Sequence, residues 1–159
     1  MHRRTTPRRK TCRGCAAVEM AMVAPVLLLV LLGTVETCRM CDVTSRLTTA
    51  AREGARLAAM DRSDIVAEGQ TTNDKIISDV QGFIASSGLP VDQATVVIAE
   101  MDDPDTEFDL DDPANELGLF QVRVTVPYSA VNPLAPSPWD QYLLVGRVVF
   151  RNAQASMVQ

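Results

Sequence analysis

The chain has 159 residues, with 15 Lys and Arg residues against 20 Asp and Glu residues, and its formal net charge is −5. Six basic residues and no acidic ones lie within residues 1–14, so residues 15–159 hold nine basic against 20 acidic residues, a net charge of −11. A chain this acidic beyond its first residues argues against nucleic acid as a partner, and against anionic lipid as a surface for that part.

The first predicted element is a membrane span. Residues 16–35 form an apolar run of 20 residues, about 30 Å long as a helix, which matches the hydrocarbon thickness of a bilayer. The basic block before it resists transfer across the membrane, so we expect a cytoplasmic N-terminus and an exported C-terminal part. The sequence therefore predicts a single-pass protein of the cell membrane. The basic block consists of Arg3, Arg4, Arg8, Arg9, Lys10 and Arg13.

Glu19 is an ionisable residue inside this span. The nine Leu and Val residues between Val23 and Val35 favour insertion by about 3–5 kcal/mol in total, whereas a carboxylate at mid-span costs about 2.5–3.5 kcal/mol. Insertion is favoured, but the acid needs an explanation. Two interpretations stay open: the carboxyl group reaches the head groups or is protonated, or it awaits a positively charged partner in an assembly.

The residues around Glu19 resemble the processing site of type IV prepilins. A basic leader ends at Gly14, four small or apolar residues follow, and Glu19 and an apolar helix come next. The resemblance implies that a membrane peptidase cuts between Gly14 and Cys15 and leaves the helix on the mature protein. It makes the new α-amino group of Cys15 the natural cation for the Glu19 carboxylate of a neighbouring subunit. Such a pair is far stronger in a low-dielectric filament core than in water.

A narrower resemblance is to the TadE-like proteins of tight-adherence (Flp) pilus systems. It rests on residues 14–35, on Glu36 and on the run Ala-Arg-Glu-Gly-Ala-Arg at 51–56, and it covers roughly the first 60 residues. It implies a minor pilin or pseudopilin that acts in pilus assembly. The implied partners are the membrane, other pilin-like subunits, the pilus assembly machinery and a prepilin peptidase.

An uncleaved anchor is the alternative function. It has the same topology, keeps residues 1–14, and would display an acidic exported domain that could bind calcium.

The four cysteines do not indicate a zinc site. The pair Cys12 and Cys15 and the pair Cys38 and Cys41 lie on either side of the span, about 30 Å apart. Cys38 and Cys41 are expected to be free thiols or to form a disulfide.

Residues 15–60 are expected to form one long helix, because no proline follows Pro25 in this range and apolar residues recur at helical spacing beyond the span. Asp42 and Arg46, four residues apart, are expected to pair. A polar linker, 61–72, follows. Asn73 is then the predicted N-cap of a second helix with an apolar stripe, which Gly88 and Pro90 end. The stripe consists of Ile76, Ile77, Val80, Phe83 and Ile84.

Three strands are predicted in residues 73–159, the expected exported domain, at 94–101, 119–126 and 143–150. The second alternates apolar and polar residues, which is typical of a half-buried strand. Gly146 is a possible bulge in the third. Trp139 and Tyr142 are expected to cap the small core rather than to form a contact surface. The predicted fold is α+β and pilin-like: a long N-terminal transmembrane helix projecting into a small head, in which one helix packs on a roughly three-stranded antiparallel sheet.

The acidic segment 100–116 holds nine acids in 17 residues and is the one stretch that could bind a metal ion. Five acids fall at positions 1, 3, 5, 7 and 12 of a calcium loop, but Leu110 replaces the expected glycine and Pro113 stands at position 9. A solvated acidic loop is the preferred interpretation. Catalytic motifs are absent from the sequence: the only histidine is His2, and no Gly-rich phosphate loop or zinc-protease helix occurs. We therefore expect that the protein is not an enzyme and that it binds no cofactor. The weak calcium candidates are Asp105, Glu107, Asp109, Asp111 and Glu116.

Overall fold

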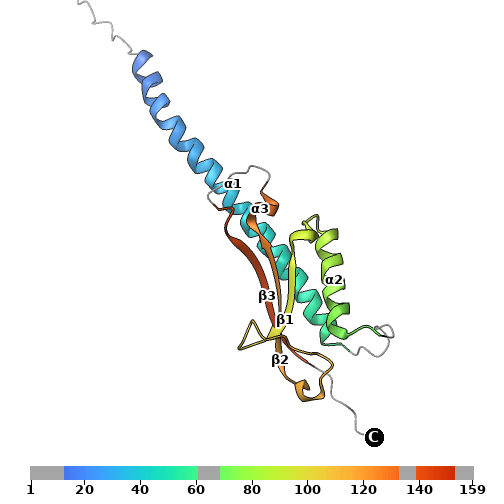
Figure 1. The fold of residues 1–159 in the computed structure, drawn as a ribbon. Coiled ribbons are helices and arrows are strands. Elements are labelled where there is room, and N and C mark those ends of the chain that lie inside the picture. Colours follow the sequence, from blue (N-terminus) through green and yellow to red (C-terminus); the bar gives the residue numbers. More distant parts are fainter. Residues whose placement is uncertain (1–12, 61–68, 133–138, 153–159) are drawn as a thin grey trace, which may run out of the picture. The chain divides into compact units, whose positions relative to one another are not determined.

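The computed structural model of the protein describes residues 13–60, 69–132 and 139–152 (Figure 1). Residues 1–12 of the predicted leader and residues 61–68 of the predicted linker lie outside these ranges. Contacts between residues divide the chain into two compact units, Met1–Arg39 and Met40–Gln159.

Helix α1, Arg13–Ala58, is the first element, and its 46 residues correspond to about 69 Å of helix. The most apolar window within Ala16–Ala58 has a mean hydropathy of 2.3, and none of that window is buried. By length and composition, α1 can therefore cross a membrane. The expected long helix is confirmed, with its first residue at Arg13 and its last at Ala58.

Helix α2, Thr72–Ser86, begins one residue earlier than predicted. Its N-cap is Thr71, whose hydroxyl oxygen accepts a hydrogen bond from the Asp74 backbone N–H at 3.1 Å. The prediction that Asn73 is the N-cap is therefore wrong; this residue lies in the first turn and is free to bond elsewhere. Gly88, at a φ of +75°, follows the helix in the left-handed conformation that favours glycine. The apolar stripe is confirmed, with Ile76, Val80 and Ile84 buried.

The sheet consists of β1, Thr95–Glu100, β2, Leu119–Pro127, and β3, Leu143–Arg151. The strands lie in the order β1-β2-β3 and both pairings are antiparallel, so the predicted α+β fold is confirmed. Alternation places one set of side chains on an inner face, where they form a core with α1 and α2. That set includes Val96 and Ile98 of β1, Phe120, Val122, Val124 and Val126 of β2, and Leu144 of β3. The short helices η1, Val91–Gln93, η2, Pro113–Asn115, and α3, Tyr128–Val131, lie in the connections.

Two glycines let the elements approach closely. A Cβ atom on Gly146 would lie only 2.3–2.6 Å from backbone atoms of Leu47 and Thr48, so β3 lies directly on α1. Gly146 pairs with Val124 in an uninterrupted register, and the predicted bulge is therefore wrong. Likewise, a Cβ atom on Gly54 would lie 2.3 Å from a methyl group of Val80, which brings α1 and α2 together.

The second part of α1 belongs to the core of the second unit. Its buried face is built from one valine, one leucine and four alanines, and the small alanine side chains allow the sheet and α2 to pack close to the helix. Arg46 joins the helices at the surface: it pairs with Asp42 at 3.0 Å, as predicted, and donates a hydrogen bond to the Ser87 carbonyl oxygen at 2.9 Å. The buried face consists of Val43, Leu47, Ala50, Ala51, Ala55 and Ala58.

Trp139 and Tyr142 are not caps of the core. Their exposed fractions are 45% and 49%, and the two rings contact each other, with centroids 5.6 Å apart. The preferred prediction for this pair is therefore wrong. Tyr128 of α3, by contrast, is fully buried in the core.

Candidate functional site

The predicted processing and assembly residues all lie at the start of α1. The bond between Gly14 and Cys15 lies directly after Arg13, the first described residue of α1. Apart from its chain neighbours and the nearby backbone of α1 itself, no atom of the described residues lies within 4 Å of the place that a Cβ atom on Gly14 would occupy.

Glu19 is exposed on an apolar helical surface. It lies four residues after Cys15, which places the two residues on the same side of α1 and about 6 Å apart along its axis. The neighbouring exposed side chains are apolar, so a charged carboxylate here is favourable only with a cation or with water at hand. These neighbours are Val18, Met20, Met22 and Val23.

Cys38 and Cys41 lie further along α1. Both are exposed and free, and they form no disulfide in the described part of the chain. Because they are three residues apart on one helix, their side chains share a face that another molecule can reach.

The acidic candidates for calcium do not converge on one point. The Asp111 carboxylate accepts hydrogen bonds from the backbone N–H and the hydroxyl group of Thr72, and Glu107 accepts one from the Asn73 amide at 3.2 Å. The side chain of Asp105 is 92% exposed. Within residues 13–60, 69–132 and 139–152, no three His, Cys, Asp or Glu side chains are grouped so as to hold a metal ion. Calcium binding at this segment stays a prediction.

The other two candidates shape the loop locally. Asp109 accepts a hydrogen bond from the Asp111 backbone N–H at 2.9 Å, and its own carbonyl oxygen accepts one from the Asn115 amide at 2.8 Å. Glu116 follows η2, and its backbone N–H donates to the Pro113 carbonyl oxygen. The acids thus organise the backbone between β1 and β2.

Asn73 and Asn152 hold the acidic segment to the core. The Asn73 amide donates to the Phe108 carbonyl oxygen at 2.9 Å, and its side-chain oxygen accepts from the Leu110 backbone N–H at 3.2 Å. Asn152 donates to the carbonyl oxygens of Leu110 and Asn115. Sequence reasoning missed this role of both residues, because a buried asparagine carries no periodic signal and its partners lie 34 or more residues away.

We call residues 101–106 the tip of the acidic segment, and its hydrogen bonds centre on Asp103. The Thr106 hydroxyl donates to its carboxylate at 2.7 Å, and the Asp105 backbone N–H donates at 3.1 Å. These hydrogen bonds, that of Thr106 first, hold the pKa of Asp103 below its usual value. The two hydrogen bonds therefore stabilise the ionised form of the Asp103 carboxyl group.

The order of helices and strands defines the class of protein. It is an α+β protein in which one long apolar helix precedes a second helix and a three-stranded antiparallel sheet, a pilin-like arrangement.

Residues 14–56 match the model of the family described as TadE-like protein. The resemblance predicted from the sequence is thus confirmed over that segment. The family is associated with Tad pili and is not a family of enzymes. No curated protein and no solved structure matches the chain.

Proposed function

We propose that this protein is a minor pilin or pseudopilin that acts in the assembly of a tight-adherence (Flp) type IV pilus. The observation that carries the proposal is the family match, which begins at Gly14 and ends at Arg56. Those bounds take in the proposed cutting site, the apolar part of α1 and the part of α1 that lies in the core. Among the described residues, one helix is long and apolar enough to cross a membrane, and this supports a single-pass membrane protein.

Processing begins with the orientation of the chain. The basic leader stays in the cytoplasm, the apolar part of α1 crosses the bilayer, and residues beyond it are exported. The peptidase then hydrolyses the peptide bond between Gly14 and Cys15. This step removes six positive charges and creates one new ammonium group at the inner end of α1. The mature protein waits in the membrane until it is extracted.

Assembly uses the charge at Glu19. When α1 leaves the lipid for a bundle of neighbouring α1 helices, its carboxylate needs a counter-charge in a low-dielectric environment. The new ammonium group of Cys15 on an adjacent subunit supplies it. Because Cys15 and Glu19 are about 6 Å apart along the axis, the pair also fixes the axial offset between neighbouring subunits.

N-terminal sequencing of the membrane-bound protein tests the processing step. We expect the mature protein to begin at Cys15, whereas the alternative function, a permanent anchor, keeps Met1. A Gly14→Val variant is expected to keep its leader, and open space around Gly14 means that the substitution does not disturb the fold. Gly33→Val, at an equally open position in α1, is the matched control and should be cut normally. A wild-type protein that begins at Met1 would refute the proposal.

A further inference from the structure

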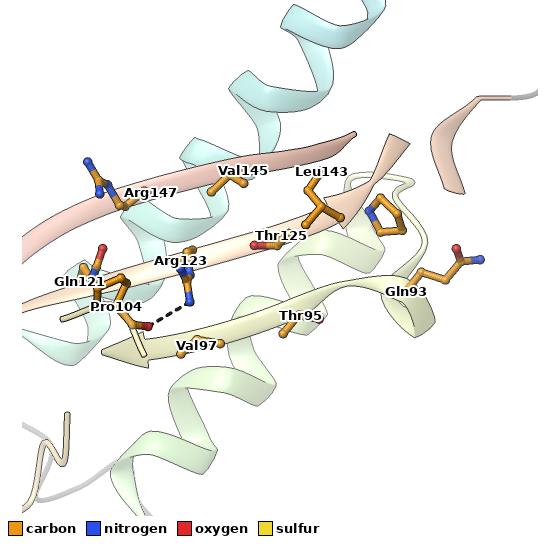
Figure 2. A pocket seen from close by; sticks show the side chains of 11 residues that line it. Gln93, Thr95, Val97, Pro104, Gln121, Arg123, Thr125, Leu143, Val145 and Arg147 are labelled. Carbon is orange, nitrogen blue, oxygen red and sulfur yellow. Dashed lines mark hydrogen bonds between the residues drawn. The ribbon is translucent and has the colours of Figure 1, made fainter. Parts of the chain in front are cut away.

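The face of the sheet turned away from α1 and α2 carries a groove of about 660 Å³ (Figure 2). We call it the sheet groove. Side chains from all three strands stand on it, because alternate residues of each strand point away from the core. They include Thr95 and Val97 of β1, Gln121 and Arg123 of β2, and Val145 and Arg147 of β3.

The charged side chains that line the groove are both arginines. Arg123 and Arg147 are directly opposite each other in the register of β2 and β3, and like charges in this position repel. The Arg123 guanidinium group donates a hydrogen bond to the Pro104 carbonyl oxygen at 3.0 Å. Its Nη2 atom lies 3.9 Å from the Oδ1 atom of the Asp105 carboxylate. Arg147 is exposed, and its side chain has no ion pair with any other described residue. In a protein with 20 acids, this groove is a local site of positive charge.

Gln121 is a second, independent sign of an occupant. The residue is 1% exposed and lines the groove, and its amide nitrogen donates to the Glu100 carbonyl oxygen at 2.7 Å. Its side-chain oxygen is buried and has no hydrogen-bond partner within the described ranges. A buried acceptor without a donor costs free energy, which a backbone N–H group of a bound segment would recover.

We infer that the sheet groove of one copy of this protein receives the tip of the acidic segment of a second copy. The tip offers exposed carboxylates, which the unpaired guanidinium group of Arg147 lacks. Asp102 and Asp105 are exposed there, and the hydrogen bonds from Thr106 and from the Asp105 backbone hold the pKa of Asp103 below its usual value. Met101, 45% exposed, supplies an apolar side chain for the valines of the groove.

This contact goes beyond the proposed function and does not depend on it. Each copy carries both the sheet groove and the tip of the acidic segment. The contact therefore forms between identical chains whether or not the leader is removed and whether or not Glu19 pairs with a cation. It lies between the second units, and it is charged, so screening by salt weakens it.

The test places single full-length copies in separate nanodiscs of zwitterionic lipid, so that the apolar parts of α1 cannot meet. Association is measured by energy transfer between nanodiscs that carry donor-labelled and acceptor-labelled protein at low ionic strength. The groove variant is Arg147→Glu, and the loop variant is Asp102→Lys, because Asp105 lies close to Arg123 of its own groove. Each variant alone is expected to weaken self-association by about tenfold or more. Arg151→Glu, a change at an exposed arginine on the same strand but outside the groove, is the matched control and should associate normally.

The decisive sample mixes the groove variant with the loop variant. Reversed charges then face each other at one of the two contacts, so we expect association to return to within a few-fold of the wild-type strength. Restoration identifies a second copy as the occupant. Absence of association between wild-type copies would overturn the inference, as would a loop variant that binds as well as the wild type, since another acidic partner would then have to fill the groove.

Discussion

Gly146 lies where β3 crosses the backbone of α1, and the reason for a glycine there is spatial. Its φ is not in the left-handed region, and its pairing with Val124 is regular. A side chain would instead point into the peptide group that joins Leu47 and Thr48. Backbone atoms cannot move aside as the end of a flexible side chain can. The position is therefore a close contact between a strand and a helix.

Replacement of Gly146 by alanine should destabilise the second unit. The added methyl group forces β3 away from α1, and overpacking of this kind costs about 1–3 kcal/mol of unfolding free energy. Urea unfolding of the full-length protein in detergent micelles measures it, with Trp139, the only tryptophan, as the fluorescent reporter within the second unit.

Gly82→Ala is the control for this substitution. Gly82 lies in α2 and has open space around it, so alanine there should stabilise the protein by up to about 1 kcal/mol. Equal effects of the two substitutions would mean that close packing on α1 is not what position 146 requires.

At the scale of elements, the strands and the helices could be predicted because each carries a periodic pattern over many residues. In β2, Phe120, Val122 and Val124 alternate with more polar residues, and this alternation locates both faces of the sheet. The cap of α2 could not be chosen reliably. Thr71, Thr72 and Asn73 are all good N-cap residues, and the choice among them depends on Asn73 being used by the acidic segment instead.

Replacement of Asn73 by alanine should release the acidic segment from α2. Two buried backbone groups, the Phe108 carbonyl and the Leu110 N–H, each lose a hydrogen-bond partner, so we expect a loss of about 2–4 kcal/mol. Hydrogen exchange of the full-length protein should show faster exchange in residues 102–112 than in the sheet. The matched control is Thr71→Ala, which removes the cap of α2 and costs about 1 kcal/mol without loosening that segment. Unchanged exchange in the Asn73 variant would refute this role.

At the scale of the whole molecule, the contacts that could not be predicted join residues far apart in sequence. Arg123 and Arg147 lie on different strands, and only the register of β2 and β3 brings them opposite each other. Asn73 meets the acidic segment for a similar reason, because the packing of α2 on the sheet sets that distance. The predicted residues Gly14, Cys15 and Glu19 are of another kind: they are neighbours in sequence, so a short pattern was enough to suggest them.

The same division applies to the two parts of α1. Up to residue 35 its surface is apolar and exposed, which suits lipid or other α1 helices. From Val43 onward its small buried residues pack in the second unit. A substitution in the first part can therefore change insertion and assembly while it leaves the core intact, and Glu19 is the residue at which the two effects separate most clearly.

Glu19→Ala should block assembly but not insertion. Removal of a carboxylate from the span makes insertion easier, so the amount of membrane-bound, processed protein should stay the same or rise. Without its counter-charge, the Cys15 ammonium group of a neighbouring subunit would be desolvated unpaired, so the share of the protein in the assembled pilus fraction should fall by about tenfold or more, or at least 1.4 kcal/mol. Glu19→Gln keeps the size of the side chain and should fail equally, because the charge is what matters. Asp42→Ala, which removes an acid that pairs with Arg46 at 3.0 Å on the same helix, is the control and should assemble normally. Normal amounts of the Glu19→Ala protein in the pilus fraction would show that the carboxylate has no part in docking.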